Sequence, residues 1–283
     1  MIRSLHRFVF ALVIFLGAVP YAFAQDAHPD DAVLRPAEPD FGLISLPTAL
    51  RLPQGGSAFR LTHRFSLPLN HNTADEVFGR LLGIDSNAIT GIEYRYGLLP
   101  NLQVGMHHSG DNRTWSFFGE YGVVRQGERV PADITVFAAV DSPRVPVIGV
   151  ANSFERQASP SVAVLVSRTF EEHLAVYVEP IVVSNIFNEF GTPSSSDKAF
   201  LVGLGGRVRV LPTVYLVAEV APRVAGFSAN TTHAAVGIEK RAGGHVFQLN
   251  VSNSFGTVMS QLAQGGGPAN NWHLGFNLSR KFF

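Results

Sequence analysis

Apolar and polar side chains alternate in short runs along most of this chain after residue 56. The last run, residues 270–283, keeps the alternation almost to the C-terminus. A period of two residues is that of a β-strand whose two faces have different surroundings. We read about twelve such runs, which begin near Ser57, Asn87, Asn101, Thr114, Ala132, Pro160, Leu174, Ala199, Thr213, Thr232, Gly244 and Asn271.

The connections between these runs fall into two length classes. Short turns follow the even-numbered runs, at residues 96–100, 126–129, 171–173, 211–212 and 242–243. Long connections follow most odd-numbered runs, at 67–86, 142–159, 184–198, 221–231 and 253–270, with 110–113 as a short exception. Outer-membrane barrels have short periplasmic turns on one rim and long outer loops on the other. The pattern therefore predicts an all-β fold, a transmembrane up-and-down antiparallel β-barrel of about 12 strands with both termini in the periplasm.

A soluble barrel or sandwich would show the same alternation, so the polar face has to decide between the two. Its larger members are arginines and glutamates, interleaved with Gly, Ser, Thr and Asn. The chain contains only three lysines, Lys198, Lys240 and Lys281, whereas water-exposed surfaces are rich in lysine. These features favour a membrane barrel with its arginines and glutamates inside.

The charged residues assigned to the interior are the main candidates for a functional site. They are Arg60, Arg64, Glu93, Arg95, Glu120, Arg207, Arg209, Glu219 and Glu239. Arg207 and Arg209 share one face of the eighth predicted strand, and two of the glutamates lie on the next two strands. The set predicts either a polar constriction that selects small solutes or a salt-bridge lattice that fills the barrel. The strand number does not decide between these two arrangements. Barrels of eight strands are filled by side chains and barrels of sixteen or more enclose a channel, and about 12 strands lies between these sizes.

The C-terminal strand is expected to close the barrel against the first strand, which leaves no free sheet edge. Its expected membrane-facing residues are Trp272, Leu274, Phe276, Leu278 and Phe282. The ending resembles the C-terminal aromatic signal of outer-membrane barrels, so the barrel assembly machinery and outer-membrane lipid are expected partners. Phe283 falls on the other face, with Lys281. Either the strand ends in a bulge or Phe282 serves as the terminal aromatic residue.

The N-terminal residues predict secretion. Arg3 and Arg7 precede an apolar run, residues 8–19, and an A-x-A cleavage site ends at Ala24. We therefore expect a signal peptide at residues 1–24, a Pro-rich periplasmic segment at 25–56 and the barrel at 57–283. The expected location is the outer membrane of a Gram-negative cell.

Composition excludes several other classes. The formal net charge is 0, which gives no electrostatic reason to expect nucleic acid. The chain has no cysteine, so disulfides, thiolate metal sites and cysteine nucleophiles are excluded. No cofactor or metal site is predicted.

His107, His108 and Ser109 are the candidates for catalysis. The two histidines point to opposite faces of a strand and cannot share a metal ion. Ser109 and His107 share a face but lie about 7 Å apart along the strand, with no identifiable partner. Polar residues at a strand end are the favoured interpretation. His63 falls on the apolar face, where we expect it at the level of the lipid headgroups.

The first half of the predicted barrel resembles a bacterial β-barrel family known only as domain of unknown function 5777. The resemblance covers roughly residues 46–140 and rests on the motifs at 62–65, 78–79, 83–85, 91–98, 102–106 and 120–126. Where family members tend to have glycine after His-Arg-Phe, this chain has Ser66. The resemblance implies an outer-membrane barrel and no established activity.

Three functions are compatible with these predictions. The leading one is a channel or pore for small solutes. A non-conducting scaffold or receptor would instead dock an unidentified periplasmic or extracellular protein through the long loops or the Pro-rich segment. A membrane-embedded hydrolase would need an activatable serine, and Ser109 with His107 is its weak candidate.

Overall fold

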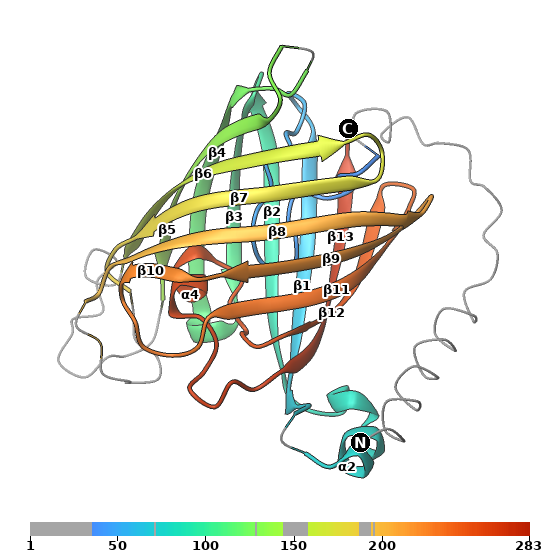
Figure 1. The fold of residues 1–283 in the computed structure, drawn as a ribbon, viewed down its shortest axis with the longest axis vertical. Coiled ribbons are helices and arrows are strands. Elements are labelled where there is room, and N and C mark those ends of the chain that lie inside the picture. The colour runs from blue at the N-terminus through green and yellow to red at the C-terminus, as the bar shows by residue number, and fades with distance from the viewer. Residues whose placement is uncertain (1–35, 71, 128, 144–157, 187–193, 195) are drawn as a thin grey trace.

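Nearly all regular structure in this chain is antiparallel sheet (Figure 1). The computed structural model describes residues 36–70, 72–127, 129–143, 158–186, 194 and 196–283. The described strands are β1 (Ser57–Pro68), β2 (Ala88–Leu99), β3 (Leu102–Ser109), β4 (Thr114–Val124), β5 (Asp133–Ser142), β6 (Ser159–Phe170), β7 (Leu174–Val183), β8 (Ala199–Leu211), β9 (Val214–Ala221), β10 (Arg223–Gly226), β11 (His233–Ala242), β12 (His245–Ser252) and β13 (His273–Phe282). Short helices lie in three connections: α2 (Ala74–Gly79), η2 (Leu81–Gly83), η3 (Asp111–Arg113) and α4 (Met259–Gln264).

The sheet closes on itself. Neighbouring strands pair in chain order, β1 pairs with β13, and the remaining gap is closed by pairing of β8 with β9. The short β10 follows β9 after Pro222 and also pairs with β8, so the two together occupy one strand position. The predicted antiparallel barrel of twelve strands is confirmed. The predicted first residue of each strand lies within two residues of the observed first residue, and the largest difference is Asn271 against His273.

The two rims differ as the sequence predicted. Short turns join β2 to β3, β6 to β7, β8 to β9 and β11 to β12. We call this end the short-turn rim; it also carries the start of β1 and the end of β13. Long connections, and the short one with η3, lie at the other end, which we call the long-loop rim.

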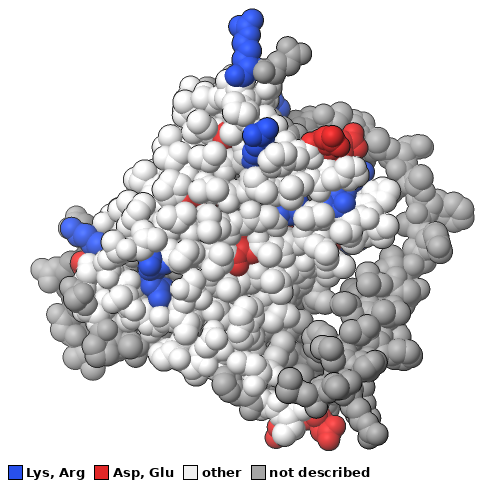
Figure 2. Space-filling model, viewed as in Figure 1, with Lys and Arg blue, Asp and Glu red and all other residues white. Residues whose placement is uncertain are grey.

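The outer face of the barrel is apolar. Many large hydrophobic side chains are exposed there, as expected for contact with lipid acyl chains. They include Ile92, Tyr94, Tyr96, Phe117, Tyr121, Val136, Val162, Val178, Val182, Leu216, Val236 and Phe247. Figure 2 shows one face of the molecule on which charged side chains are sparse. None of the helices in the described ranges is long and apolar enough to cross a membrane.

The closing strand pairs with β1 without irregularity from Ser57 opposite Phe282 as far as Arg64 opposite Gly275. No bulge therefore displaces the C-terminus. Phe282 is 49% exposed on the outer face, whereas Lys281 is fully buried. Phe276 stacks on His63, with ring centroids 4.8 Å apart. Of the other residues expected to face lipid, Leu278 is half-buried, Leu274 is buried, and Trp272 precedes the strand.

The Pro-rich segment lies elsewhere than expected. We predicted residues 25–56 as periplasmic, yet the described part, from residue 36 onward, enters the barrel lumen (blue in Figure 1). Leu43, Ile44 and Leu46 are fully buried and join an apolar cluster with the wall. The reason is that this stretch carries apolar side chains that the wall can bury. The predicted signal peptide, residues 1–24, lies outside the described residues.

Candidate functional site: a lumen closed from both rims

Residues 36–52 form a narrow hairpin that enters the lumen from the short-turn rim. We call it the N-terminal finger. Gly42 and Pro47 form an isolated β-bridge, and Leu43 N donates to Leu46 O at 2.8 Å. The tip, Leu43 to Leu46, therefore lies deepest in the barrel. Both ends return toward the rim, where Tyr215 Oη donates to Pro36 O at 2.8 Å.

The wall is shaped to accept this finger. Gly205 of β8 faces the lumen, and a Cβ atom placed on it would lie 2.2 Å from Cδ1 of Leu43. At Gly97 of β2, a Cβ atom would lie 2.0 Å from the carbonyl oxygen of Pro53. Contacts below 3.0 Å cannot be accommodated without movement, so glycine at these positions is what lets the finger approach.

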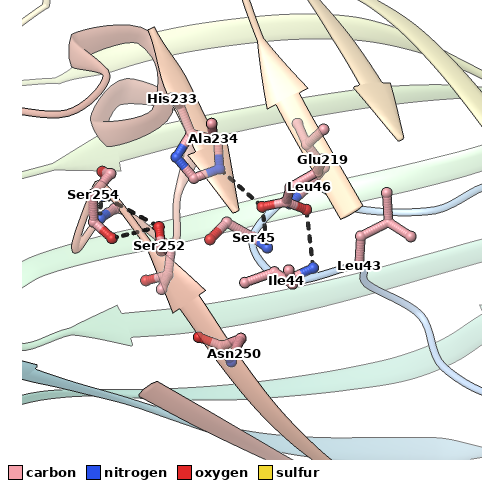
Figure 3. A network of polar contacts seen from close by, with 12 residues as sticks. Leu43, Ile44, Ser45, Leu46, Glu219, His233, Ala234, Asn250, Ser252 and Ser254 are labelled. Carbon is pink, nitrogen blue, oxygen red and sulfur yellow. Dashed lines mark hydrogen bonds and ion pairs between the residues drawn. The ribbon is translucent and has the colours of Figure 1, made fainter. Parts of the chain in front are cut away.

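Glu219 of β9 binds the tip of the finger through main-chain donors (Figure 3). Its carboxylate accepts from the N–H groups of Ile44, Ser45 and Leu46 at 2.9, 2.8 and 3.1 Å. Successive main-chain N–H groups in a turn form a concave anion-binding site. His233 Nε2 of β11 lies 2.8 Å from the same carboxylate. Glu219 is therefore satisfied by the finger and one histidine, without any arginine.

Cationic and amide side chains bind the carbonyl groups of the finger. Arg60 donates to Leu43 O and Ile44 O at 2.7 and 3.0 Å, and Arg64 donates to Ile44 O at 3.3 Å. Further bonds of this kind come from Gln248 and Asn277, and Lys281 donates to Pro39 O. The interior charges thus hold a peptide main chain.

Arg207 and Glu239 form a bidentate ion pair at the same depth. The nitrogen atoms Nε and Nη2 of Arg207 lie 2.7 and 3.0 Å from the two carboxylate oxygens of Glu239. Both side chains are fully buried. Arg207 also donates to Gly42 O at 2.8 Å, so the ion pair and the finger share one guanidinium.

A second group of charges lines the opposite wall. Arg95 lies between Glu93 and Glu120, at 2.5 and 2.6 Å, and Gln103 donates to Glu120. The side chain of Gln103 also bonds the main chain of the finger at Leu50 O and Leu52 N, both at 3.1 Å. These residues form a local salt-bridge network on this side of the lumen.

Arg209, which was expected to line the lumen on the same face of β8 as Arg207, does not join these clusters. It lies at the short-turn rim, where it contacts Glu172 at 3.0 Å and Pro212 O at 3.0 and 3.1 Å. The physical reason is position along the strand: two residues move a side chain by about 7 Å toward the end of β8.

The connection between β12 and β13, residues 253–272, enters the lumen from the long-loop rim. We call it the last loop; it contains α4, all of whose residues are buried (Figure 1). Asp141 of β5 accepts from Ser260 N at 2.7 Å. On the far side, Arg223 donates to Ala263 O and Gln264 O at 3.2 and 3.0 Å. The last loop therefore crosses the lumen.

His107 binds the last loop and has no contact with Ser109. His107 Nε2 lies 3.0 Å from Thr257 Oγ1, and its Nδ1 lies 3.3 Å from Glu93. The Ser109 hydroxyl instead contacts Asp111 N and the side chain of Gln261. Among the described residues, Ser109 and His107 therefore do not form the pair that the serine hydrolase alternative would need.

A small cavity separates the finger from the last loop. Its volume is about 30 Å³, room for roughly two water molecules. It is lined by Ser45, Pro47, Arg60, Glu93, Arg95, His107, Ser116, Phe118, Phe137, Thr257, Val258, Met259 and Leu262. Thr257, His107 and Glu93 follow one another in the order of a nucleophile, base and acid along this small cavity. Within the described ranges, no cluster of side chains suited to a metal ion occurs.

Glu179 of β7 is buried, and neither of its carboxylate oxygens has a hydrogen-bond partner among the described residues. Because an unsatisfied buried polar group costs about 1–3 kcal/mol, Glu179→Leu is expected to stabilise the barrel by that amount. The urea midpoint of the protein refolded in detergent micelles measures the change. Glu120→Leu is the matched control: it removes an equally buried but bonded carboxylate, and should destabilise by about 1.5–3 kcal/mol. Loss of stability in both variants would contradict the prediction.

Residues 40–282 match a family described as a membrane-bound β-barrel domain, domain of unknown function 5777. The chain belongs to this family. The family match therefore covers the whole barrel, whereas the resemblance seen in the sequence covered only residues 46–140. A comparison with curated proteins found no match.

Solved structures include barrels to which this family member is similar. One is the crystal structure of an outer membrane channel from Pseudomonas putida F1, with 14% identity, a TM-score of 0.49 and coverage of 82% of this chain and 97% of that chain. Another is KdgM porin, with 9% identity, a TM-score of 0.47 and coverage of 81% and 99%.

The finger and its ligands are the part of the site that sequence reasoning missed. The one available signal was the apolar stretch at residues 43–46 inside a Pro-rich segment. Thr257 as the partner of His107 had no signal, since 150 residues separate the two.

Proposed function

We propose that this membrane barrel is an outer-membrane channel for small solutes, closed in the described conformation by the N-terminal finger and the last loop. The proposal rests on one observation: the two segments that close the lumen are not strands of the barrel wall. Among the described residues, the finger forms no strand pairing with the wall, and the last loop contributes only the isolated bridge of Gly266 to Thr231. Both can leave the lumen while the sheet stays closed.

The lining of the lumen supports passage of polar solutes. Removing the finger would uncover Arg60, Arg64 and Glu219 around one depth of the barrel, and polar groups of both signs suit a selective aqueous path. The lattice of Arg95 with Glu93 and Glu120 would remain as part of the wall. In this proposal the short-turn rim faces the periplasm, so the finger enters from that side.

The proposal is tested by opening the two closures separately. A protease site inserted at the exposed turn Gln54–Gly55 lets the complete chain fold before the finger is cut free. Residues 257–264 are replaced by a short Gly-Ser linker to remove the second closure. In planar bilayers the intact protein should be silent. The barrel with its finger cleaved and washed away and its last loop shortened should conduct steadily. Barrels that carry only the cleavage or only the shortened loop then show which of the two segments blocks the ions.

Two controls accompany this measurement. The protein without the inserted site should stay silent after treatment with protease. On gels, every form should migrate differently before and after heating, which shows that the barrel is folded. A doubly opened barrel that is folded, has released its finger and still does not conduct would overturn the channel proposal. The barrel would then be a scaffold or receptor, the alternative function open from the sequence.

A further inference from the structure

The bonds between the wall and the finger go mainly to main-chain atoms. Glu219 accepts from three consecutive N–H groups, while Arg60, Arg64 and Arg207 donate to carbonyl groups at residues 42–44. Gln103 bonds one N–H and one carbonyl group farther along the finger. Main-chain groups are the same in every peptide, so these contacts recognise a polypeptide of almost any sequence.

Apolar side-chain contacts are concentrated at two positions of the finger tip, whereas Glu38, Asp40 and Arg51 bond the wall nearer the short-turn rim. The Leu43 side chain lies against Gly205, and Leu46 lies against Gly203, where an added Cβ atom would be 3.0 Å from Cδ2 of Leu46. Both leucines are fully buried. The missing side chains of two lumen-facing glycines on β8 thus form shallow sites for two apolar residues spaced three apart.

We propose that the lumen is a binding site for oligopeptides, and that the finger occupies this site as an intramolecular mimic of the ligand. This rests on the proposed channel function and names the class of solute. The ligand would be a peptide that forms a turn, with apolar residues three positions apart and the intervening N–H groups on Glu219. Charge-assisted bonds are about twice as strong as neutral ones, so Glu219, which accepts three of them, is a main anchor together with the arginines that bind the carbonyl groups.

Other solutes lack this pattern of groups. An oligosaccharide presents hydroxyl groups without the alternation of N–H and carbonyl groups that the wall matches, and it has no apolar side chains for the Gly203 and Gly205 positions. Single amino acids cannot span the distance between Glu219 at mid-depth and Gln103 nearer the short-turn rim. A peptide of roughly the length of the finger meets both conditions.

The experiment uses the complete chain with the protease site at Gln54–Gly55, folded in detergent and then cleaved. A fluorescent synthetic peptide with the sequence of residues 36–52 is added in excess, and its binding is followed by fluorescence anisotropy after the native finger has exchanged. A peptide in which both Leu43 and Leu46 are replaced by aspartate should bind at least a hundredfold more weakly. Glu219→Gln in the barrel should weaken binding at least tenfold, whereas Arg209→Ala, at the rim, should leave it unchanged.

Competition then tests the class of ligand. An unrelated peptide of the same length that shares only the two apolar positions should displace the labelled peptide, and a maltose oligosaccharide should not. Failure of the labelled peptide to exchange or bind, or displacement by the sugar alone, would overturn the inference. Binding is measured without conductance, so a silent barrel that binds peptides would overturn only the channel proposal. A conducting barrel without peptide affinity would overturn only this inference.

Discussion

Replacing Arg207 by alanine is expected to destabilise the barrel by about 3–5 kcal/mol. The guanidinium is fully buried and bonds both oxygens of Glu239, at 2.7 and 3.0 Å. Without it, the Glu239 carboxylate stays inside the barrel with Gln248 as its remaining hydrogen-bond donor among the described residues, and the carbonyl group of Gly42 loses its partner. A buried charge that loses its counter-ion costs far more than an exposed pair contributes. The urea midpoint of the protein refolded in detergent micelles measures the loss.

Arg209→Ala is the matched control for this measurement. It removes the same side chain from the same face of β8, two residues nearer the rim, where the partner Glu172 is 66% exposed. An exposed pair of this kind contributes about 0–1 kcal/mol. The double variant Arg207→Met/Glu239→Leu removes both charges and should be more stable than Arg207→Ala alone. Equal losses for Arg207→Ala and Arg209→Ala would contradict the buried ion pair.

The barrel wall could be predicted from the sequence because each strand separates two different environments. Lipid on one side and a polar interior on the other impose a period of two residues, which is visible even at Lys281 and Phe282. The lengths of the connections supplied the topology. Both signals are local, since each depends on residues within one strand or one turn.

The contents of the lumen could not be predicted in the same way. The finger has no strand period, and its prolines at 36, 39 and 47 suggested an exposed extended segment. Its burial depends on Gly205 and Glu219, which lie more than 150 residues away in the chain. The charged side chains were assigned to the interior from their alternation, but Arg60, Arg64 and Glu219 bond main-chain atoms of the finger, which carry no sequence signal.

The second large effect is expected for Gly205→Leu, which should expel the N-terminal finger from the lumen. A Cβ atom alone would lie 2.2 Å from Leu43 Cδ1, and the rest of a leucine side chain would occupy the site where Leu43 now packs. Overpacking of this kind costs about 1–3 kcal/mol when the core can shift. The finger can instead leave, because it has no strand pairing to lose. We therefore expect displacement of the finger with a closed sheet.

The absence of cysteine from the chain makes displacement directly measurable. Ser45→Cys places one thiol at the finger tip, where the residue is buried. Its rate of reaction with a water-soluble maleimide should rise at least tenfold when Gly205→Leu is added, since local opening governs access to buried groups. Gly206→Leu is the control, because Gly206 faces outward and an added Cβ atom there meets no atom closer than 3.8 Å. Equal labelling in the Gly205 and Gly206 variants would mean that the finger stays in place. The lumen would then be a permanent core, and the bonds of Glu219 to the finger would serve stability alone.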